Sequence, residues 1–349
     1  MRALRRLCLL CPVFACAATA DAAPLIRAVG VVANDLACDN VNHRLYVTTP
    51  GSAGATGNTL RAIDPITATL GASVVVGPEP HRIAVSDDGQ FAYVGLDGAA
   101  GVSKVALATF TLVQQFPLGS SVETGVRFVD DLEVMPGNPQ TIAVSLRNNF
   151  ASPRHEGVAI FDNGVMRATA TPRHTGSNVI EFGATPDVLY GYDNEISEYG
   201  FRTMSVTATG VNITSTRAGL ISGFDADFAF GGGKVVSTTG RVIDPVAGAI
   251  LGGLNTAGPV AVEDDGSRAY ILSGSAIQVF DLNTFARLDT ITLPGNTGGY
   301  QIVRFGDDGL AVRSNNAIYL INSTSIPEPA MGLLALAWLT PFATRRRRR

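Results

Sequence analysis

One stretch of sequence decides the fold of this chain: residues 80–119, which read PHRIAVSDDGQFAYVGLDGAAGVSKVALATFTLVQQFPLG. A second version occupies residues 258–295 as GPVAVEDDGSRAYILSGSAIQVFDLNTFARLDTITLPG. Each version contains four short apolar runs separated by Gly, Asp and Ser, a pattern typical of strands and tight turns. In the second version we expect strands at Pro259–Val262, Arg268–Leu272, Ala276–Phe280 and Leu288–Leu293.

The same cassette recurs along the chain when the copies are aligned on their second strand. The centres of that strand are Tyr46, Tyr93, Ala143, Tyr190, Val236, Tyr270 and Ala311. A spacing of roughly 35–50 residues is that of four-stranded propeller blades. The sequence therefore predicts an all-β, seven-bladed β-propeller over residues 23–325. In the fourth blade the third strand is less distinct, and we expect it within Ser197–Thr207.

The seventh copy ends after its third strand, at Ser323-Thr324. An unassigned strand, Ile26–Val32, stands at the other end of the body. We expect it to complete the seventh blade beside Ile318–Asn322, because such closure removes exposed sheet edges. A six-bladed ring with an extra sheet remains the alternative.

Composition limits the class of protein. The chain has 349 residues, of which 46% are hydrophobic and 16% charged, enough for a large core. Eight of the 26 basic residues lie in the two terminal segments, so the body is more acidic than the formal net charge of −4 and a poor match to nucleic acid. Outside the N-terminal segment the one cysteine is Cys38, which excludes a disulfide framework and suggests a small core residue.

Residues 1–22 have the layout of a secretory signal peptide. Three arginines within the first six residues precede an apolar run, Leu7–Ala18, and small residues follow. Ala20 and Ala22 form an Ala-x-Ala site, so we expect cleavage after Ala22. An uncleaved anchor helix and a lipoprotein signal through Cys16 are the alternatives.

Residues 326–349 combine three features. Pro327-Glu328-Pro329 comes first, an apolar segment follows from Ala330 to Leu339, and the chain ends in Arg345, Arg346, Arg347, Arg348 and Arg349. The apolar segment is short for a full membrane span. A block of arginines holds its end on the cytoplasmic side.

Two family resemblances follow from these motifs. Ile83–Gly89, Tyr93-Val94 and Ile63-Asp64-Pro65 resemble the YVTN-type repeat of bacterial seven-bladed β-propellers. The C-terminal segment resembles the PEP-CTERM sorting signal, which the membrane protease-transpeptidase exosortase processes in Gram-negative bacteria that make exopolysaccharide. By that resemblance Pro327, Glu328 and Pro329 are the recognition triplet and the apolar helix is inserted only transiently. A plain single-pass C-terminal anchor is the alternative.

The innermost strands carry unusual charges. When the copies are aligned on the Ile83-Ala84-Val85 triplet, the central residue of the innermost strand is Ala37 in blade 1, Ala84 in blade 2 and Ala261 in blade 6. The aligned residues in blades 3, 4, 5 and 7 are Glu133, Glu181, Asp227 and Arg304. Polar residues that break a core rule are candidate sites. We expect the three carboxylates to line one side of the central channel, opposite Arg304, and to hold a cation or a polar ligand; a one-residue slip would turn them away.

A second ring of polar residues marks the strand entrances: Asn34-Asp35, His81-Arg82, Asp130-Asp131, Asn178, Asp225 and Gln301. His81 and Arg82 suit a hydrolytic, lactonase-like centre. No two histidines have metal-ligand spacing and no Gly-x-Ser-x-Gly elbow occurs. The three Asp-Asp-Gly triplets fit turns better than calcium loops.

These features predict a non-enzymatic exported protein with no cofactor, apart from the option of a cation in the axial channel. Signal peptidase and exosortase are its expected processing partners, and exopolysaccharide or another envelope protein its binding partner. We expect it to be held briefly at the inner membrane and then displayed on the outer surface or in the matrix. A propeller hydrolase of lactonase type, acting at the axial pocket, is the alternative function.

Overall fold

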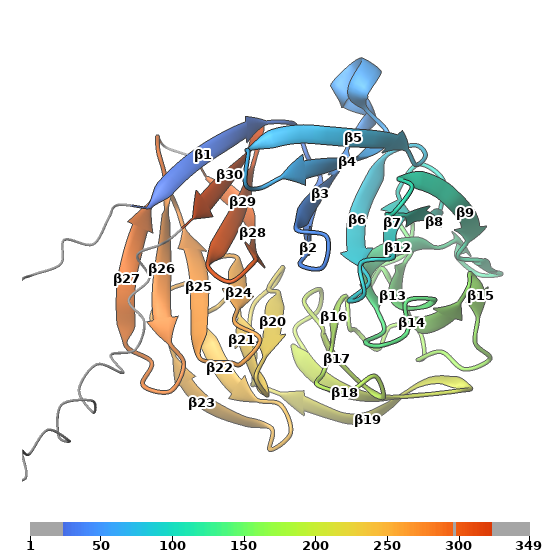
Figure 1. The fold of residues 1–349 in the computed structure, drawn as a ribbon. Coiled ribbons are helices and arrows are strands. Elements are labelled where there is room, and N and C mark those ends of the chain that lie inside the picture. The colour runs from blue at the N-terminus through green and yellow to red at the C-terminus, as the bar shows by residue number, and fades with distance from the viewer. Residues whose placement is uncertain (1–23, 296–297, 323–349) are drawn as a thin grey trace, which may run out of the picture.

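The computed structural model describes residues 24–295 and 298–322, which form seven four-stranded antiparallel sheets arranged as a ring (Figure 1). The seven-bladed β-propeller predicted from the repeat is confirmed. The signal peptide with its Ala20/Ala22 site and the sorting segment with Pro327, Glu328, Pro329 and Arg345–Arg349 lie outside the described residues. Within the described ranges no helix is long and apolar enough to cross a membrane.

Blades 1 to 3 occupy the first part of the ring, each numbered from the axis outward. Blade 1 consists of β2 (Asp35–Asp39), β3 (Arg44–Thr49), β4 (Thr59–Asp64) and β5 (Thr69–Val75). Blade 2 consists of β6 (Pro80–Val85), β7 (Phe91–Leu96), β8 (Gly101–Ala106) and β9 (Thr111–Pro117). Blade 3 consists of β12 (Phe128–Val134), β13 (Thr141–Arg147), β14 (His155–Asp162) and β15 (Val165–Met166).

Blades 4 to 6 repeat the pattern. Blade 4 consists of β16 (Val179–Phe182), β17 (Val188–Tyr192), β18 (Gly200–Thr207) and β19 (Gly210–Ala218). Blade 5 consists of β20 (Phe228–Gly231), β21 (Lys234–Ser237), β22 (Arg241–Asp244) and β23 (Ala249–Gly253). Blade 6 consists of β24 (Val260–Val262), β25 (Arg268–Ser273), β26 (Ala276–Asp281) and β27 (Arg287–Thr292).

Blade 7 closes the ring with strands from both ends of the described chain. Its strands are β28 (Gly299–Phe305), β29 (Gly309–Ser314), β30 (Ala317–Asn322) and β1 (Leu25–Gly30). β1 pairs antiparallel with β30, with Leu25 opposite Asn322 and Gly30 opposite Ala317. The predicted closure is therefore confirmed, and the six-bladed alternative is wrong.

Two small elements lie outside the blades: a 3₁₀ helix, η1 (Gly51–Thr56), and a hairpin of β10 (Ser120–Ser121) and β11 (Gly125–Val126). Both interrupt connections on one face of the ring. We call this the entrance face, because the innermost strands begin there; the opposite face is the exit face.

The hydrophobic core is divided among the seams between blades. The described residues contain seven buried apolar clusters, one for each pair of neighbouring blades. In the seam between blades 1 and 2, for example, Tyr46 and Leu60 pack with Val94 and Leu96. The apolar strands thus bury their side chains against the next blade, which explains why one sheet cannot be stable alone.

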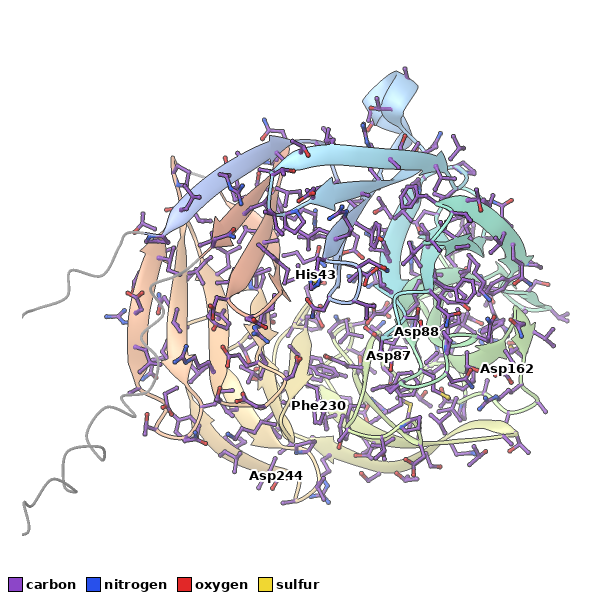
Figure 2. The ribbon with its side chains drawn as sticks, in the orientation of Figure 1. His43, Asp87, Asp88, Asp162, Phe230 and Asp244 are labelled. Carbon is purple, nitrogen blue, oxygen red and sulfur yellow. The ribbon has the colours of Figure 1, made fainter. Side chains whose placement is uncertain are left out.

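The Asp that ends the third strand of several blades stabilises the next turn. The Asp64 carboxylate accepts the backbone N–H groups of Ile66 and Thr67, and Asp244 accepts those of Val246 and Ala247 in the same way. These hydrogen bonds, together with a smaller effect of a nearby arginine, lower the pKa of Asp64. Asp162 and Asp244 lie at the periphery of the ring, where these turns lead to the outermost strands (Figure 2).

Candidate functional site

A cavity of about 550 Å³ opens on the entrance face at the starts of the innermost strands. It brings together three of the sequence-predicted site residues, His81, Arg82 and Asp227. Four members of the predicted strand-entrance ring also line it, namely Asn34, Asp35, Asp225 and Gln301. We call this space the entrance cavity; its size is within the usual range of small-molecule sites.

The positive charge of Arg82, which lines this cavity, interacts with several carboxylates near it. Its Nε donates to the carbonyl oxygen of Asp130 at 3.1 Å and lies 4.0 Å from Oδ1 of Asp131. Burial lowers the pKa of Arg82, but the carboxylates of Asp131, Asp35 and Asp227 outweigh it and raise the pKa overall. Arg82 therefore remains charged among several acids.

Several of these polar side chains join one blade to the next. Oδ2 of Asp35 in blade 1 accepts the N–H of Ile83 in blade 2 at 2.9 Å. Oδ2 of Asp131 in blade 3 accepts the N–H of Ile180 in blade 4, also at 2.9 Å. Gln301 of blade 7 makes two hydrogen bonds to the backbone of Leu36 in blade 1. Part of the entrance ring is thus structural, since it ties neighbouring inner strands together.

Burial raises the pKa of two acids at the entrance face, Asp131 and Asp227. Burial raises the pKa of Asp131 to about 7, with Arg82 opposing the rise and Asp227 adding to it. Burial also raises the pKa of Asp227, although the Arg82 charge and the Phe228 N–H oppose it. Desolvation is the largest cause of both shifts, and repulsion by neighbouring carboxylates adds to it.

Glu133 lies two residues after Asp131 of the entrance ring, and Glu181 lies three residues after Asn178. Glu133 is paired with Ala143, and Glu181 with Tyr190, the register predicted from the repeat. The Glu181 carboxylate accepts the N–H of Phe230 in blade 5, a residue near the axis (Figure 2). Within the described part of the chain, the Glu133 carboxylate has no hydrogen-bond partner.

Both glutamates have a pKa well above the ordinary value. Burial is the largest cause for each, and Asp227 and Asp131 add repulsion in both cases. Glu133 is further affected by Glu181, so the two carboxyl groups interact electrostatically. The structure therefore places Glu133, Glu181 and Asp227 within electrostatic reach of one another, with Arg82 as the nearby cation.

The predicted position of Arg304 is wrong. The residue of blade 7 that corresponds to Ala84 is Val303, which pairs with Ala311, whereas Arg304 pairs with Leu310 and belongs to the other face of the sheet. Its side chain donates to the carbonyl oxygen of Asp307 and lies 3.8 Å from Asp264 Oδ1, on the exit face.

The cause is a difference in turn length. The turn between the first two strands spans residues 86–90 in blade 2 but only 306–308 in blade 7, so counting back from Asp-Asp-Gly slips by one residue. Blade 5 has a still shorter turn, and there the residue opposite Val236 is Ala229 rather than Asp227. The register error in blade 5 is two residues, which is one full side-chain period of a strand, so Asp227 still points to the face that the sequence predicted.

A chain of charged contacts leads from the cavity toward blade 3, and no sequence motif predicts it. His81 Nδ1 lies 3.4 Å from Asp97 Oδ2, and Arg147 donates to the other oxygen of Asp97 at 2.8 Å. Arg147 Nε lies 3.7 Å from Asp130 Oδ1, and Asn178 donates to Asp130 Oδ2 at 3.1 Å. Asp97 and Arg147 belong to no motif, and only the fold brings them together.

Further buried polar groups lie in blade 3 near the blade 4 seam. The Glu156 side chain is 0% exposed and is approached by Arg173 at 3.2 Å and Arg127 at 3.8 Å. Burial, together with nearby cations, lowers the pKa of His155 to about 3. Neither ring nitrogen of His155 has a hydrogen-bond partner among the described residues.

Metal-binding geometry does not appear in the described ranges: no three His, Cys, Asp or Glu side chains there are grouped so as to hold an ion. The Asp-Asp-Gly triplets bond to their own turns, since Asp88 accepts the N–H of Gln90 and Asp265 that of Ser267. Burial raises the pKa of Cys38 to about 12, so this thiol is not activated.

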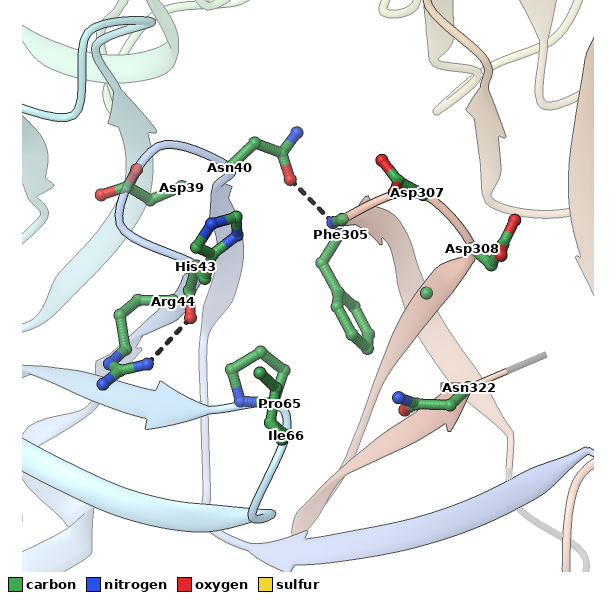
Figure 3. A pocket seen from close by; sticks show the side chains of 12 residues that line it. Asp39, Asn40, His43, Arg44, Pro65, Ile66, Phe305, Asp307, Asp308 and Asn322 are labelled. Atoms are coloured by element: carbon green, nitrogen blue, oxygen red, sulfur yellow. Dashed lines mark hydrogen bonds between the residues drawn. The ribbon is translucent and has the colours of Figure 1, made fainter. Parts of the chain in front are cut away.

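A second cavity, of about 280 Å³, lies on the exit face between blades 1 and 7 (Figure 3). Phe305, Pro65 and Ile66 give it apolar walls, and Asp39, His43 and Asp307 are among its polar residues. Asn40 crosses the seam to accept the N–H of Gly306 at 2.9 Å. None of the residues predicted for the axial pocket is in the lining of this cavity, so it is separate from the entrance site.

Comparison with known proteins supports the fold. No protein-family model matches the chain, and no curated protein matches it. Among solved structures, hydrazine synthase of Kuenenia stuttgartiensis matches with a TM-score of 0.67 and 13% identity, over 85% of this chain and 97% of that one. The β-propeller domain of Myceliophteria thermophila Cps50 (Swd1) matches with a TM-score of 0.64 and 11% identity, over 87% and 99%. At these identities the likeness shows the β-propeller fold alone.

Proposed function

We propose that this protein is an exported, non-enzymatic component of the cell envelope or exopolysaccharide matrix that displays its propeller as a binding module. The observation that carries the proposal is the position of the sheets. All seven sheets lie between Leu25 and Asn322, and therefore between the segment that resembles a secretory leader and the segment that resembles a PEP-CTERM signal. Cleavage after Ala22 and near residues 327–329 would leave each strand intact.

Ring closure supports this reading. The strands nearest the two terminal segments, β1 and β30, are neighbours in one sheet. Signal peptidase and exosortase would therefore act on segments that leave the same blade. The basic end would hold the chain briefly at the inner membrane through its apolar run, and processing would release the propeller to the outer surface or the matrix.

The processing step can be tested in the native host. Glu328→Gln should leave the C-terminal segment attached, because it removes the carboxylate of the triplet; mass spectrometry of the C-terminal peptide and cell fractionation would show a longer, membrane-held form. Ser325→Ala, close to the triplet but outside it, should be processed normally. Normal processing of the Glu328→Gln chain would contradict the proposed sorting route.

A hydrolase of lactonase type is the second candidate. The favouring observation is the pair of partly buried glutamates, whose pKa is raised well above the ordinary value, as suits a general acid. Purified protein would be screened for lactone hydrolysis. Turnover that falls at least about 100-fold in Glu181→Gln and in His81→Ala, but not in the exposed variant Asp264→Asn, would favour the enzyme. Absence of turnover in the folded wild-type protein would favour the binding module.

A further inference from the structure

Two large aromatic side chains stand exposed at the entrance cavity. Phe224 is 60% exposed and Tyr300 is 55% exposed, and both line the cavity. Phe224 precedes the innermost strand of blade 5, whereas Tyr300 is the second residue of β28 in blade 7. Exposed aromatic rings that line one cavity are typical of a binding surface, because covering such a ring with a ligand removes a large apolar area from water.

Both rings are held in place by neighbours. Phe224 meets the ring of Tyr199 edge-on, with 5.1 Å between centroids. Arg313 lies over the Tyr300 ring, with Cζ 5.6 Å from its centroid. Arg313 is itself fixed, because it donates to Gln301 Oε1 at 3.0 Å and to the Ala33 carbonyl oxygen at 3.2 Å. A ligand would meet prepositioned rings and would lose little entropy in ordering them.

One wall of the entrance cavity comes from blade 6, which stands between blades 5 and 7 in the ring. It is formed by Gly258, Pro259 and Val260 of blade 6. Gly258 has φ of +146°, and a Cβ there would lie 1.9 Å from the carbonyl oxygen of Leu272. A side chain is therefore excluded at this position, and Gly258 contributes only backbone to the cavity wall.

The remaining lining offers hydrogen bonds in both directions. Asp227 uses Oδ1 to accept the N–H of Phe228, which leaves Oδ2 available as an acceptor. Thr238 and Thr239 add hydroxyl groups, and the guanidinium of Arg82 adds donors. Asp35, Asp225 and Asp227 outnumber the two arginines of the lining, so an anionic ligand would be repelled.

We propose that the entrance cavity binds an uncharged saccharide, whose C–H faces pack on Phe224 and Tyr300 and whose hydroxyl groups bond to Asp227 and its polar neighbours. A sugar hydroxyl both donates and accepts, which suits a lining of carboxylates, hydroxyls and guanidinium. This inference rests on the proposed binding function and names its ligand class.

The test uses the full-length protein and a panel of neutral oligosaccharides of glucose, galactose, mannose and N-acetylglucosamine, with the same sugars oxidised to uronates. Glycan-array binding and calorimetry should find a neutral ligand, with at least about tenfold weaker binding of its uronate counterpart. Phe224→Ala and Tyr300→Ala should each weaken that ligand by about tenfold or more, while Tyr300→Phe should retain most of the affinity.

Phe150→Ala is the matched control, because Phe150 is 86% exposed and does not line the entrance cavity. It should bind like the wild type. The inference is overturned if the folded protein binds no neutral member of the panel, if it prefers uronates, or if neither cavity variant changes the affinity. Normal processing and matrix retention in that event would leave the proposed function standing, whereas failure of processing with intact sugar binding would overturn only the export route.

Discussion

Blades 2 and 3 are neighbours, yet they fill the same position in opposite ways. In blade 2 the small residue Ala84 is on the first strand and the large residue Tyr93 faces it on the second. In blade 3 the large residue is Glu133 on the first strand, and Ala143 is opposite. The large residue of this cross-strand pair can therefore stand on either strand, and its polarity can differ between neighbouring blades.

The difference extends from that pair to the surrounding seam. Tyr93 donates its hydroxyl to the Pro139 carbonyl oxygen in blade 3 at 2.8 Å, so blade 2 satisfies its buried polar atom. Blades 3 and 4 and the loop before them hold most of the buried side-chain atoms that lack a partner among the described residues. They belong to Thr124, Arg127, Arg154, His155, Glu156, Ser177, Asn178, Asp193 and Asn194. Ordered water usually satisfies such groups.

The largest loss of stability is expected from a substitution in blade 2. Tyr93→Ala should lower the free energy of unfolding by about 4 kcal/mol, because it removes a fully buried ring. Urea denaturation followed by circular dichroism would measure the loss. Tyr300→Ala is the control, since that ring is mostly exposed, and should change stability by less than about 0.5 kcal/mol. Equal effects of the two substitutions would show that the seam between blades 2 and 3 is not the packed core described above.

A slightly smaller loss of stability is expected from a substitution beside the buried polar groups of blade 3. Arg173→Leu should cost about 3 kcal/mol, because the buried Glu156 carboxylate loses its nearer cation. Adding Glu156→Gln should recover part of that loss by removing the uncompensated charge. The exposed Arg287, replaced by Leu, serves as the control in the same urea experiment. A double variant less stable than Arg173→Leu alone would refute the electrostatic explanation.

The third prediction moves the large residue of blade 3 from the first strand to the second, as in blade 2. Ala143→Tyr should cost about 2 kcal/mol by overpacking against Glu133. Combining it with Glu133→Ala recreates the blade 2 arrangement and should restore most of the stability. A double-mutant cycle on thermal unfolding would give the coupling between the two positions. Additive effects would mean that the two side chains do not share one space.

The smallest effect concerns pH. The folded pKa of Glu133 is raised by burial and then by Asp131, Glu181, Asp227 and Asp35. Such an acid contributes its full stability below the unfolded pKa of about 4, and this contribution is lost as pH rises toward the folded value. Glu133→Gln should therefore match the wild type near pH 4 and exceed it by about 1 kcal/mol at pH 8. Urea titrations at both values would test this, and a variant that gains stability only at acid pH would reverse the assigned sign.

The sequence predicted the blades because each copy carries its own local signals. Tyr93-Val94 and Asp87-Asp88-Gly89 mark a strand and a turn within a few residues of each other, and such signals survive in isolation. The inner-strand register failed in blades 5 and 7, where turns are shorter than in blade 2. Glu133 and Glu181 were identified as unusual because they stand where the regular blades have alanine.

The contacts around those glutamates could not be predicted in the same way. Asp97 follows the second strand of blade 2, whereas Arg147 and Asp130 lie on two different strands of blade 3, and the three meet only through the fold. The aromatic residues Phe224 and Tyr300 are ordinary in the sequence, and only their shared exposure at one cavity distinguishes them.

The number of blades, their strand order and the closing strand follow from the amino-acid sequence, because the alternation of apolar runs and turn residues is a local property of the chain. The tertiary structure alone decided which charges meet at the axis, which polar atoms are buried without a partner and which rings border the entrance cavity. These properties depend on distances between residues far apart in the chain, such as Gln301 and Leu36, which are 265 positions apart. Seam packing sets such distances, and no local pattern encodes them.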